Sequence, residues 1–348
     1  MVMNERTFVL KGTICYSNSL TELSITENGY LVCEDGRCAG VFDELPEKFA
    51  GISCTDFGDE LIIPGLTDLH LHAPQYTFRA SGMDLELLDW LNTYTFPQEA
   101  RYEDTEFAKE AYSIFAEDMK KSPNTRACIF GTLHVPATEI LMEQLDKTGI
   151  KAMVGKVNMD RNGSPQLQEE SAQVSADATV QWIEDTLDKF ENVKPILTPR
   201  FTPSCSDELM EKLSEIQKRY HLPMQSHLSE NFGEIAWVKE LCPNTHFYGE
   251  AYSQFGLFGG DCPTIMAHCV HSSDEEIALM KKAFILLIVR SLTQISPQVS
   301  LLRDVIWMKV YTSDWVLTLQ VELPFLFCVP WLMLFRFPSC TGGWLILL

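Results

Sequence analysis

The alternation of apolar and polar residues predicts short strands in the first 60 residues and a different pattern after them. Asn28-Gly29 and Asp35-Gly36 are dipeptides that favour tight hairpin turns. A small sheet of this kind cannot bury a core alone and needs a partner elsewhere in the chain. The expected strands are residues 7–14, 23–25, 30–33 and 38–42.

From residue 61 onward, apolar strand-like runs alternate with amphipathic helical stretches, which is the pattern of a parallel α/β fold. Ser273 and Glu276 stand at capping-box spacing before the last expected helix. Eight such strands would close a barrel, whose active site lies at the C-terminal strand ends. The expected strands are residues 66–72, 127–133, 152–157, 196–201, 224–227 and 264–268, and the expected helices include residues 107–120, 172–190, 207–220 and 274–282.

The run LIIPGLTDLHLH, residues 61–72, carries the most specific local signal in the chain. His70 and His72 are two residues apart, so on a strand both imidazoles project from the same face. Two neutral imidazoles directed at one point make half of a metal site, and imidazole suits zinc, iron and nickel. A pair of surface histidines on a half-exposed strand is the alternative, and the motif alone does not separate the two.

Other chemically active side chains stand at the ends of the expected strands, and this favours the metal site. His72, Arg200, His227 and His268 all occupy such ends. His70, His72 and His227 are candidate metal ligands, with His268 close by. The four remaining histidines are expected to be structural: His134, His221, His246 and His271.

Glu230 and the pair Arg200-Phe201 suggest roles around such a metal. Glu230 follows His227 by three residues and is placed to take a proton from an activated water. The alternative is a solvated carboxylate favoured by a helix N-terminus. Arg200-Phe201 offers a forked donor and an aromatic face, which suit a planar heterocycle with carbonyl oxygens. The alternative there is a structural salt bridge over a core phenylalanine.

Composition limits the function classes further. The net charge of −21 and the pI near 4.7 argue against a nucleic-acid partner, because such proteins need basic faces. Eleven cysteines occur without a Cys-x-x-Cys pair, which suits a reducing compartment. The first residues, MVMNERTFVL, do not read as a signal peptide. The expected location is therefore cytoplasmic.

Five segments resemble the guanine deaminases of the amidohydrolase superfamily. The similarity runs in order from residue 1 to about residue 282 and is more specific than the superfamily's general His-x-His. The segments are residues 64–104, beginning PGLTDLHLHAPQYTF, GKVNMDRN at 155–162, TPRFTPSCS at 198–206, QSHLSEN at 225–231 and MAHCVHSSDEE at 266–276.

The resemblance implies a zinc-bearing (β/α)8 TIM-like barrel beside a small β-sandwich built from both chain ends. It implies that His70, His72, His227 and His268 are the zinc-site histidines and that Glu230 is the proton shuttle. Gln75, Arg200 and Phe201 would hold the guanine. The implied reaction is attack of a zinc-activated water on C2 of guanine, which yields xanthine and ammonia. A homodimer acting in guanine catabolism is implied for the full-length protein.

The last 66 residues depart from this family. They hold seven charged residues and four of the seven tryptophans, whereas the first 282 residues hold 68 charged residues. The family's last two strands and its metal-binding aspartate are not recognisable there, and Asp314 in TSDW is the nearest counterpart. The apolar run 323–335 is too short to span a membrane, and Pro324 and Pro330 interrupt it.

A shift of the reading frame accounts for the tail. Codons that begin one base earlier force Asp-Glu across residues 307–309 and Leu-Gly across residues 314–316. Synonymous codons also permit AHCPKSHTNISSGISP across residues 286–302 and DEGIHVGLGSDIAGG across residues 307–322, and both strings resemble the missing family segments. We call this reading the alternative frame.

The expected organisation therefore has three parts: residues 1–63 as part of a β-sandwich, 64–282 as an incomplete barrel of about six strands, and 283–348 as an aberrant tail. The leading hypothesis is a guanine deaminase whose site is incomplete in this chain. Three alternatives stay open: a deaminase of another purine or a triazine, a non-catalytic metal- or purine-binding remnant, and a membrane-attached protein that uses the apolar tail.

Overall fold

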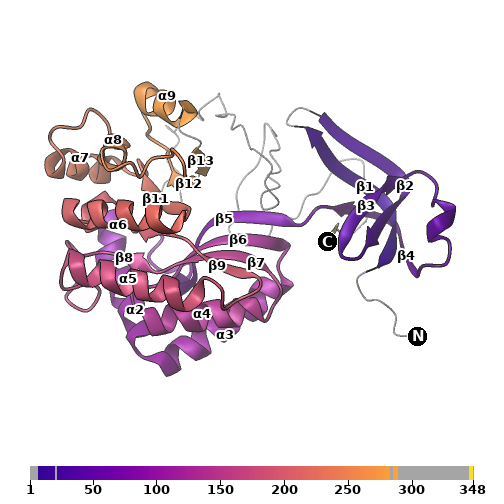
Figure 1. The fold of residues 1–348 in the computed structure, drawn as a ribbon, viewed down its shortest axis with the longest axis horizontal. Helices are drawn as coiled ribbons and strands as arrows, with labels where there is room; N and C mark the ends of the chain where they lie inside the picture. The colour runs from indigo at the N-terminus through magenta and orange to yellow at the C-terminus, as the bar shows by residue number, and fades with distance from the viewer. Residues whose placement is uncertain (1–6, 20–21, 283–284, 289–344, 348) are drawn as a thin grey trace. The chain divides into compact units, whose positions relative to one another are not determined.

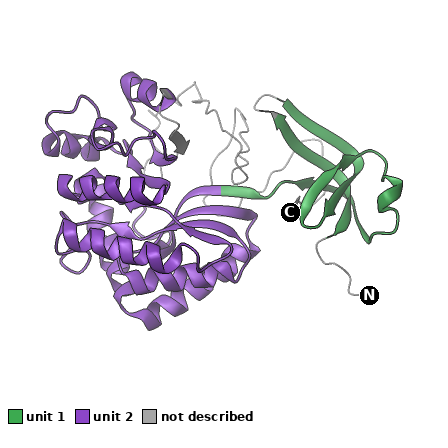
Figure 2. Ribbon diagram, viewed as in Figure 1, with its two compact units in different colours: residues 1–67, 312–348 green, residues 68–311 purple. Residues whose placement is uncertain are grey.

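The structure is a computed structural model in which the chain divides into two compact units (Figure 2). The first unit comprises residues 1–67 and 312–348, and the second comprises residues 68–311. The first is built around a β-sheet, and the second alternates strands with helices (Figure 1). The described residues are 7–19, 22–282, 285–288 and 345–347.

The sheet of the first unit has five strands in the order β14-β4-β1-β2-β3. β1 pairs antiparallel with β2 and parallel with β4; β2 also pairs antiparallel with β3, and β4 pairs parallel with β14. The strands are β1 Phe8–Ser19, β2 Glu22–Glu34, β3 Arg37–Phe42, β4 Cys54–Ile63 and β14 Leu345–Leu347, with a 3-10 helix at Glu47–Phe49.

Of the two dipeptides expected to form hairpin turns, only one does so. Asp35 and Gly36 form the expected hairpin turn between β2 and β3, with φ of 53° and 78°. The expected hairpin at Asn28-Gly29 is wrong, because β2 passes through it and the register with β1 shifts there. Asn28 has φ of 52°. A β-bulge and a tight hairpin both need residues that tolerate positive φ, so the dipeptide does not distinguish them.

The strands of the second unit follow one another in chain order. One sheet has the order β5-β6-β7-β9, another pairs β8 with β10, and a third has the order β11-β12-β13. The pairs β6–β7, β7–β9, β8–β10, β11–β12 and β12–β13 are all parallel. The bounds are β5 Leu66–His72, β6 Asn124–Phe130, β7 Lys151–Gly155, β8 Val157–Asn158, β9 Val193–Pro195, β10 Thr198–Pro199, β11 Met224–Leu228, β12 Thr264–His268 and β13 Ile285–Ile288.

All six expected strands overlap observed ones, but 152–157 is divided into β7 and β8, and 196–201 contains only β10, with β9 directly before it. No strand was expected after residue 282, and that expectation is wrong for β13 and, in the first unit, for β14. These residues carry no recognisable family motif. A parallel edge strand needs only an extended backbone that reaches the open edge of β12, and four consecutive apolar residues suit it.

The longer helices pack in sequence, α3 against α4, α4 against α5 and α5 against α6 (Figure 1). Their inner faces and the strands enclose the main core, in which Tyr112, Phe115, Leu141, Trp182 and Leu213 are buried. The helices are α1 Leu87–Trp90, α2 Phe96–Ala100, α3 Thr105–Lys121, α4 Val135–Asp146, α5 Ala172–Thr186, α6 Asp207–Tyr220, α7 Phe232–Leu241, α8 Glu250–Ser253 and α9 Asp274–Lys282, with a π-helical turn at Leu91–Thr95 and 3-10 turns at Ala73–Phe78, Arg101–Glu103 and Thr202–Ser204.

The capping box expected at α9 is only half formed. Ser273 Oγ accepts the Glu276 N–H at 3.2 Å, but the Glu276 carboxylate turns inward. Glu276 accepts instead from Ser229 Oγ at 2.9 Å and from Gly249 N–H at 2.6 Å. Local spacing assigned this carboxylate to the helix cap, but donors distant in sequence bind it instead.

Candidate active site

The four candidate ligand histidines come from the C-terminal ends of three strands. His70 and His72 lie at the C-terminal end of β5. His227 is the penultimate residue of β11, and His268 is the last residue of β12. β11 and β12 are parallel, with Leu228 opposite His268, so their ends lie at one edge. The structure therefore brings together side chains that are up to 198 positions apart in sequence.

Three of the four imidazoles converge on one point, and the fourth, that of His72, lies beside them. One ring nitrogen from each of His70, His227 and His268 lies within 4.8 Å of the other two. His72 joins them, because its Nε2 lies 3.0 Å from Nε2 of His227. The ring centroids of His70 lie 5.1, 4.9 and 4.9 Å from those of His72, His227 and His268. Imidazole nitrogens that converge in this way can ligate a single ion.

Hydrogen bonding and burial keep these rings in the form that binds metal. Nδ1–H of His227 donates to the backbone oxygen of Arg200 at 2.5 Å, which leaves the lone pair of Nε2 directed at the other rings. Burial is the main cause that lowers the pKa of His72 and of His227 well below the ordinary value. A neutral imidazole is the metal-binding state. Nδ1 of His72 is buried and has no hydrogen-bond partner within the described part of the chain.

Glu230 lies directly beside this set, on the turn that follows β11. Its Oε2 lies 3.3 Å from Nε2 of His268, and its side chain is 7% exposed. Burial raises the pKa of Glu230 to about 8. Ser229, His268 and Cys269 have positive φ of 49°, 72° and 55°, which is uncommon for residues other than glycine. Such backbone cost is typical of functional sites.

A second buried carboxylate, Glu234, holds the turn that carries Glu230. Its Oε2 accepts the backbone N–H of Glu230 at 2.9 Å and that of Asn231 at 3.4 Å. Its Oε1 accepts the hydroxyl of Tyr248 at 2.9 Å. Burial raises the pKa of Glu234 to about 7. Glu276 accepts a hydrogen bond from Ser229, so Glu234 and Glu276 together hold this turn. The spacing of residues in the sequence does not indicate either contact.

Arg200 follows β10 and turns its guanidinium toward a residue that the sequence interpretation missed. It forms a buried bidentate ion pair with Glu99, with Nη1–Oε2 at 2.5 Å and Nη2–Oε1 at 3.2 Å. Gln75 Nε2 donates to the same Oε1 at 3.1 Å. The salt bridge considered as an alternative for Arg200 therefore exists, and it also includes Gln75. A buried arginine signals a carboxylate partner, but nothing in the spacing indicates Glu99.

Phe201 packs into an apolar cluster next to Arg200. The ring is buried and belongs to one hydrophobic cluster with Leu87, Leu91 and Phe96. Trp237 meets it edge to face, with ring centroids 6.3 Å apart. An aromatic wall of this kind suits the face of a planar heterocycle.

The histidines expected to be structural lie outside the convergent set. His246 is exposed and pairs with Glu250 at 3.0 Å, and the His271 ring stacks on Phe232 with centroids 3.9 Å apart. None of the four belongs to a metal-binding group among the residues that the structure describes. They are His134, His221, His246 and His271. Asp314, the tail's nearest counterpart to a fifth ligand, lies outside the described residues.

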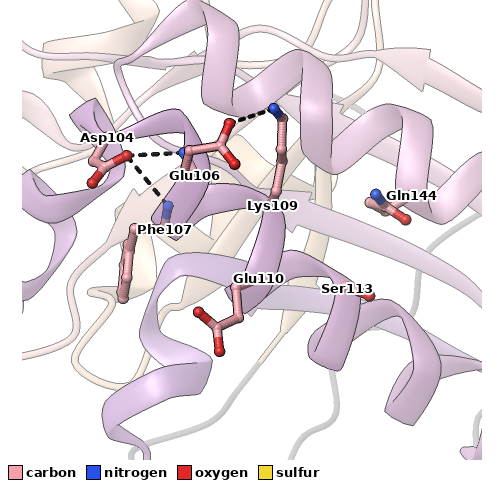
Figure 3. Close-up of a pocket in the computed structure, with 7 residues that line it drawn as sticks. All are labelled: Asp104, Glu106, Phe107, Lys109, Glu110, Ser113 and Gln144. Carbon is pink, nitrogen blue, oxygen red and sulfur yellow. Dashed lines mark hydrogen bonds and ion pairs between the residues drawn. The ribbon is translucent and has the colours of Figure 1, made fainter.

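A separate pocket opens where α3 begins, next to α4 (Figure 3). Asp104 there caps α3 by accepting the N–H groups of Glu106 and Phe107, and Glu106 pairs with Lys109 at 2.6 Å. None of the seven lining residues is a candidate site residue. These polar contacts cap the start of a helix at the surface. The histidine set is therefore the candidate active site, and this pocket is not.

Comparison with known proteins supplies the family. The model of the Amidohydrolase family matches residues 61–312. The chain belongs to the amidohydrolase family. Its fold is accordingly that of the metal-dependent amidohydrolases, the TIM-barrel class, in agreement with the class expected from the sequence.

The relatives that the chain resembles include guanine deaminases. It is 39% identical over 298 residues to that of Dictyostelium discoideum, which covers 80% of this chain and 66% of that protein. It is 44% identical over 219 residues to that of Rattus norvegicus, covering 63% of this chain and 48% of that protein. A solved guanine deaminase from C. acetobutylicum with bound guanine matches at 46% identity and a TM-score of 0.78, covering 81% of this chain and 67% of that one. The chain thus spans about half to two thirds of the length of these relatives.

Two further observations concern the cysteines and the possibility of membrane-spanning helices. The nine cysteines in the described part of the chain are all free thiols. Within the same residues, no helix combines the length and the apolar character needed to cross a bilayer.

Proposed function

We propose that the protein is a guanine deaminase, which hydrolyses guanine to xanthine and ammonia. One observation carries the proposal: buried Glu230 contacts His268 of the converging histidines, and His227 of the same set donates to the backbone oxygen of Arg200. A metal site, a proton carrier and a buried donor for a carbonyl oxygen therefore meet at one strand edge. The relatives at 39–46% identity are guanine deaminases, which supports this choice of substrate.

The ion in this proposal is zinc, held by His70, His72, His227 and His268. An all-imidazole donor set suits zinc, and the hydrogen bond from Nδ1 of His227 leaves its Nε2 able to face an ion. When bound, zinc acts as a Lewis acid that lowers the pKa of a coordinated water to about 7. Every other part of the chemistry belongs to the chain's own side chains.

Glu230 is proposed to move the proton. A buried carboxyl group whose pKa is raised can accept and return a proton, as general acid–base catalysis requires. The oxygen of water forms the new bond to C2 of guanine, and the bond from C2 to the exocyclic nitrogen breaks. Glu230 passes one proton of the water to a ring nitrogen of the purine and the second to the exocyclic amine, which leaves as ammonia.

Gln75, Arg200 and Phe201 are proposed to hold the purine. Arg200 supplies N–H donors for a carbonyl oxygen, Gln75 supplies an amide, and the buried ring of Phe201 borders the heterocycle. This combination selects a flat ring with a polar edge.

The chain's organisation is proposed on the same basis. Residues 1–63 belong to a small β-sandwich, residues 64–282 with the added strand β13 form an incomplete barrel, and the remaining tail is read out of frame. We further propose a cytoplasmic protein of guanine catabolism that binds neither nucleic acid nor membrane, and a homodimer for the full-length protein.

The proposed function is tested by turnover in a chain whose tail is translated in the alternative frame. We expect guanine to be converted to xanthine with release of ammonia, and adenine, 2-aminopurine and triazines to react far more slowly. Faster turnover of one of those heterocycles would assign another deaminase activity. Stoichiometric metal without turnover of any of them would instead indicate a non-catalytic metal-binding protein.

Zinc is expected to stabilise residues 1–348 against heat, because all four proposed histidine ligands are present in this chain. A ligand at 100 times its Kd stabilises the folded state by about 2.7 kcal/mol. Differential scanning fluorimetry of metal-free protein, titrated with zinc, should show a Tm that rises with zinc concentration.

The matched variants are His227→Ala and His246→Ala. The first removes a proposed ligand and should abolish most of the rise, whereas the second removes an exposed histidine that pairs with Glu250 and should leave the rise intact. An unchanged zinc response in His227→Ala would remove His227 from the ligand set.

A further inference from the structure

Glu99 is a buried carboxylate that touches two of the proposed purine-holding side chains at once. It lies on α2 and is 1% exposed. Its Oε1 accepts from Gln75 Nε2 at 3.1 Å and from Arg200 Nη2 at 3.2 Å, and its Oε2 accepts from Arg200 Nη1 at 2.5 Å. One carboxylate therefore fixes the positions of an amide and a guanidinium that lie 125 residues apart.

This contact determines which atom Gln75 presents elsewhere. An ionised carboxylate only accepts hydrogen bonds, so Gln75 must turn its amide nitrogen toward Glu99. The amide oxygen of Gln75 then occupies the other branch of the side chain and is available as an acceptor. Without the carboxylate, the amide has no fixed orientation, because its oxygen and nitrogen are almost the same size.

The same contact determines the orientation of Arg200. A guanidinium carries five N–H groups in a rigid plane, and the bidentate pair with Glu99 occupies two of them. Phe96, one turn before Glu99 on the same helix, lies against the guanidinium with its ring centroid 5.1 Å from Cζ. The plane is thereby held from two sides, and the remaining donors of Arg200 keep a defined direction.

We propose that Glu99 is a positioning residue that sets the purine specificity of the site. Through it, Gln75 presents an acceptor and Arg200 presents donors, a pair complementary to a ring N–H next to a carbonyl oxygen. Guanine has that edge, at N1–H and O6, whereas 2-aminopurine has neither group. The proposal rests on the proposed function, since it concerns how the same site recognises guanine.

A purely structural role for Glu99 makes a different prediction. A buried ion pair that only supports the fold would, when broken, weaken the binding of every purine by the same factor. A positioning role changes the ratio between guanine and 2-aminopurine, because only guanine uses the oriented groups. The selectivity ratio therefore separates the two roles.

The test measures purine binding by the chain whose tail is translated in the alternative frame, with its metal removed so that no turnover occurs. 2-Aminopurine is fluorescent and reports its own binding, and guanine is measured by competition against it. In Glu99→Gln the new amide can donate as well as accept, which frees Gln75 to reverse. We expect guanine binding to weaken by about 10–100-fold, the effect typical of groups that orient a binding residue, and 2-aminopurine binding to change much less.

Glu184→Gln is the matched control. Glu184 pairs with Arg219 at 3.2 Å in an exposed Arg–Glu contact, so the same substitution removes an ion pair of the same type away from the site. Both affinities should stay at the parent value. Glu99→Asp is the second variant: it keeps the charge beside Arg200 but is one methylene too short to hold Gln75 as well, so selectivity should fall while the Tm is kept.

Each outcome has a separate meaning. A parent chain that binds neither purine overturns the proposed function and the role of Glu99 with it. A parent chain that prefers guanine, with variants at position 99 that keep the same preference, overturns only the role of Glu99. Equal losses for both purines, in Glu99→Gln and in Glu99→Asp, also overturn it in favour of a structural ion pair. If Glu99→Gln does not fold, the preference of Glu99→Asp decides.

Discussion

Replacing Glu230 by glutamine is expected to lower guanine turnover by about 10²–10⁴-fold, the range typical of general acid–base groups. Glutamine keeps the size of the side chain but cannot take a proton from water and pass it on. The zinc content should stay at the parent value, since Glu230 contacts His268 but is not a proposed ligand. The measurement is kcat for guanine in the chain with its tail in the alternative frame, together with zinc content by atomic emission.

Glu184→Gln again supplies the control, because it makes the same chemical change at an exposed position. Its kcat should equal that of the parent. Full activity in Glu230→Gln would show that another group moves the proton. Loss of zinc from Glu230→Gln would show instead that the carboxylate acts mainly by holding the histidine set together.

The chain with its tail as printed is expected to be inactive and poorly stable. In the proposed site the family's aspartate is missing, and losses of this kind typically cost about 10–100-fold each in metal affinity or activity. Strands missing from the barrel would leave unpaired edges and apolar faces, which favour aggregation. Translation of the tail in the alternative frame should restore solubility and guanine turnover together.

The two chains differ only after about residue 282, so they control for each other. Expression yield, the Tm and guanine turnover are measured for both. Soluble residues 1–348 with guanine turnover equal to that of the alternative-frame chain would contradict this prediction. An experimental structure with Asp314 within ligand distance of His70 would also contradict it. Sequencing of the gene around the codons for residues 281–283 establishes independently which frame is encoded.

Buried carboxylates hold several of the proposed site residues in place. Glu99 contacts Gln75 and Arg200, and Glu234 holds the backbone that carries Glu230. Buried carboxylates are costly unless several donors reach them. Each one therefore couples the position of a proposed site residue to an element elsewhere in the fold.

The sequence by itself determined those features that depend on local periodicity. The spacing of His70 and His72 places both rings on one face of a strand, because side chains alternate with a period of two. The alternation of strands and amphipathic helices indicated a parallel α/β fold, and the His227 and Glu230 segment fell at a strand end. The family follows from the same residues, and the match to residues 61–312 supports it.

Only the tertiary structure decided which distant groups meet. Spacing could not select Glu99 as the partner of Arg200, because the two lie 101 residues apart and come from different elements. The Glu276 carboxylate left the helix cap for Ser229 and Gly249, since a buried acceptor bonds the donors that the fold brings within reach. Local pattern fixes the direction in which a side chain points, and packing fixes what it touches.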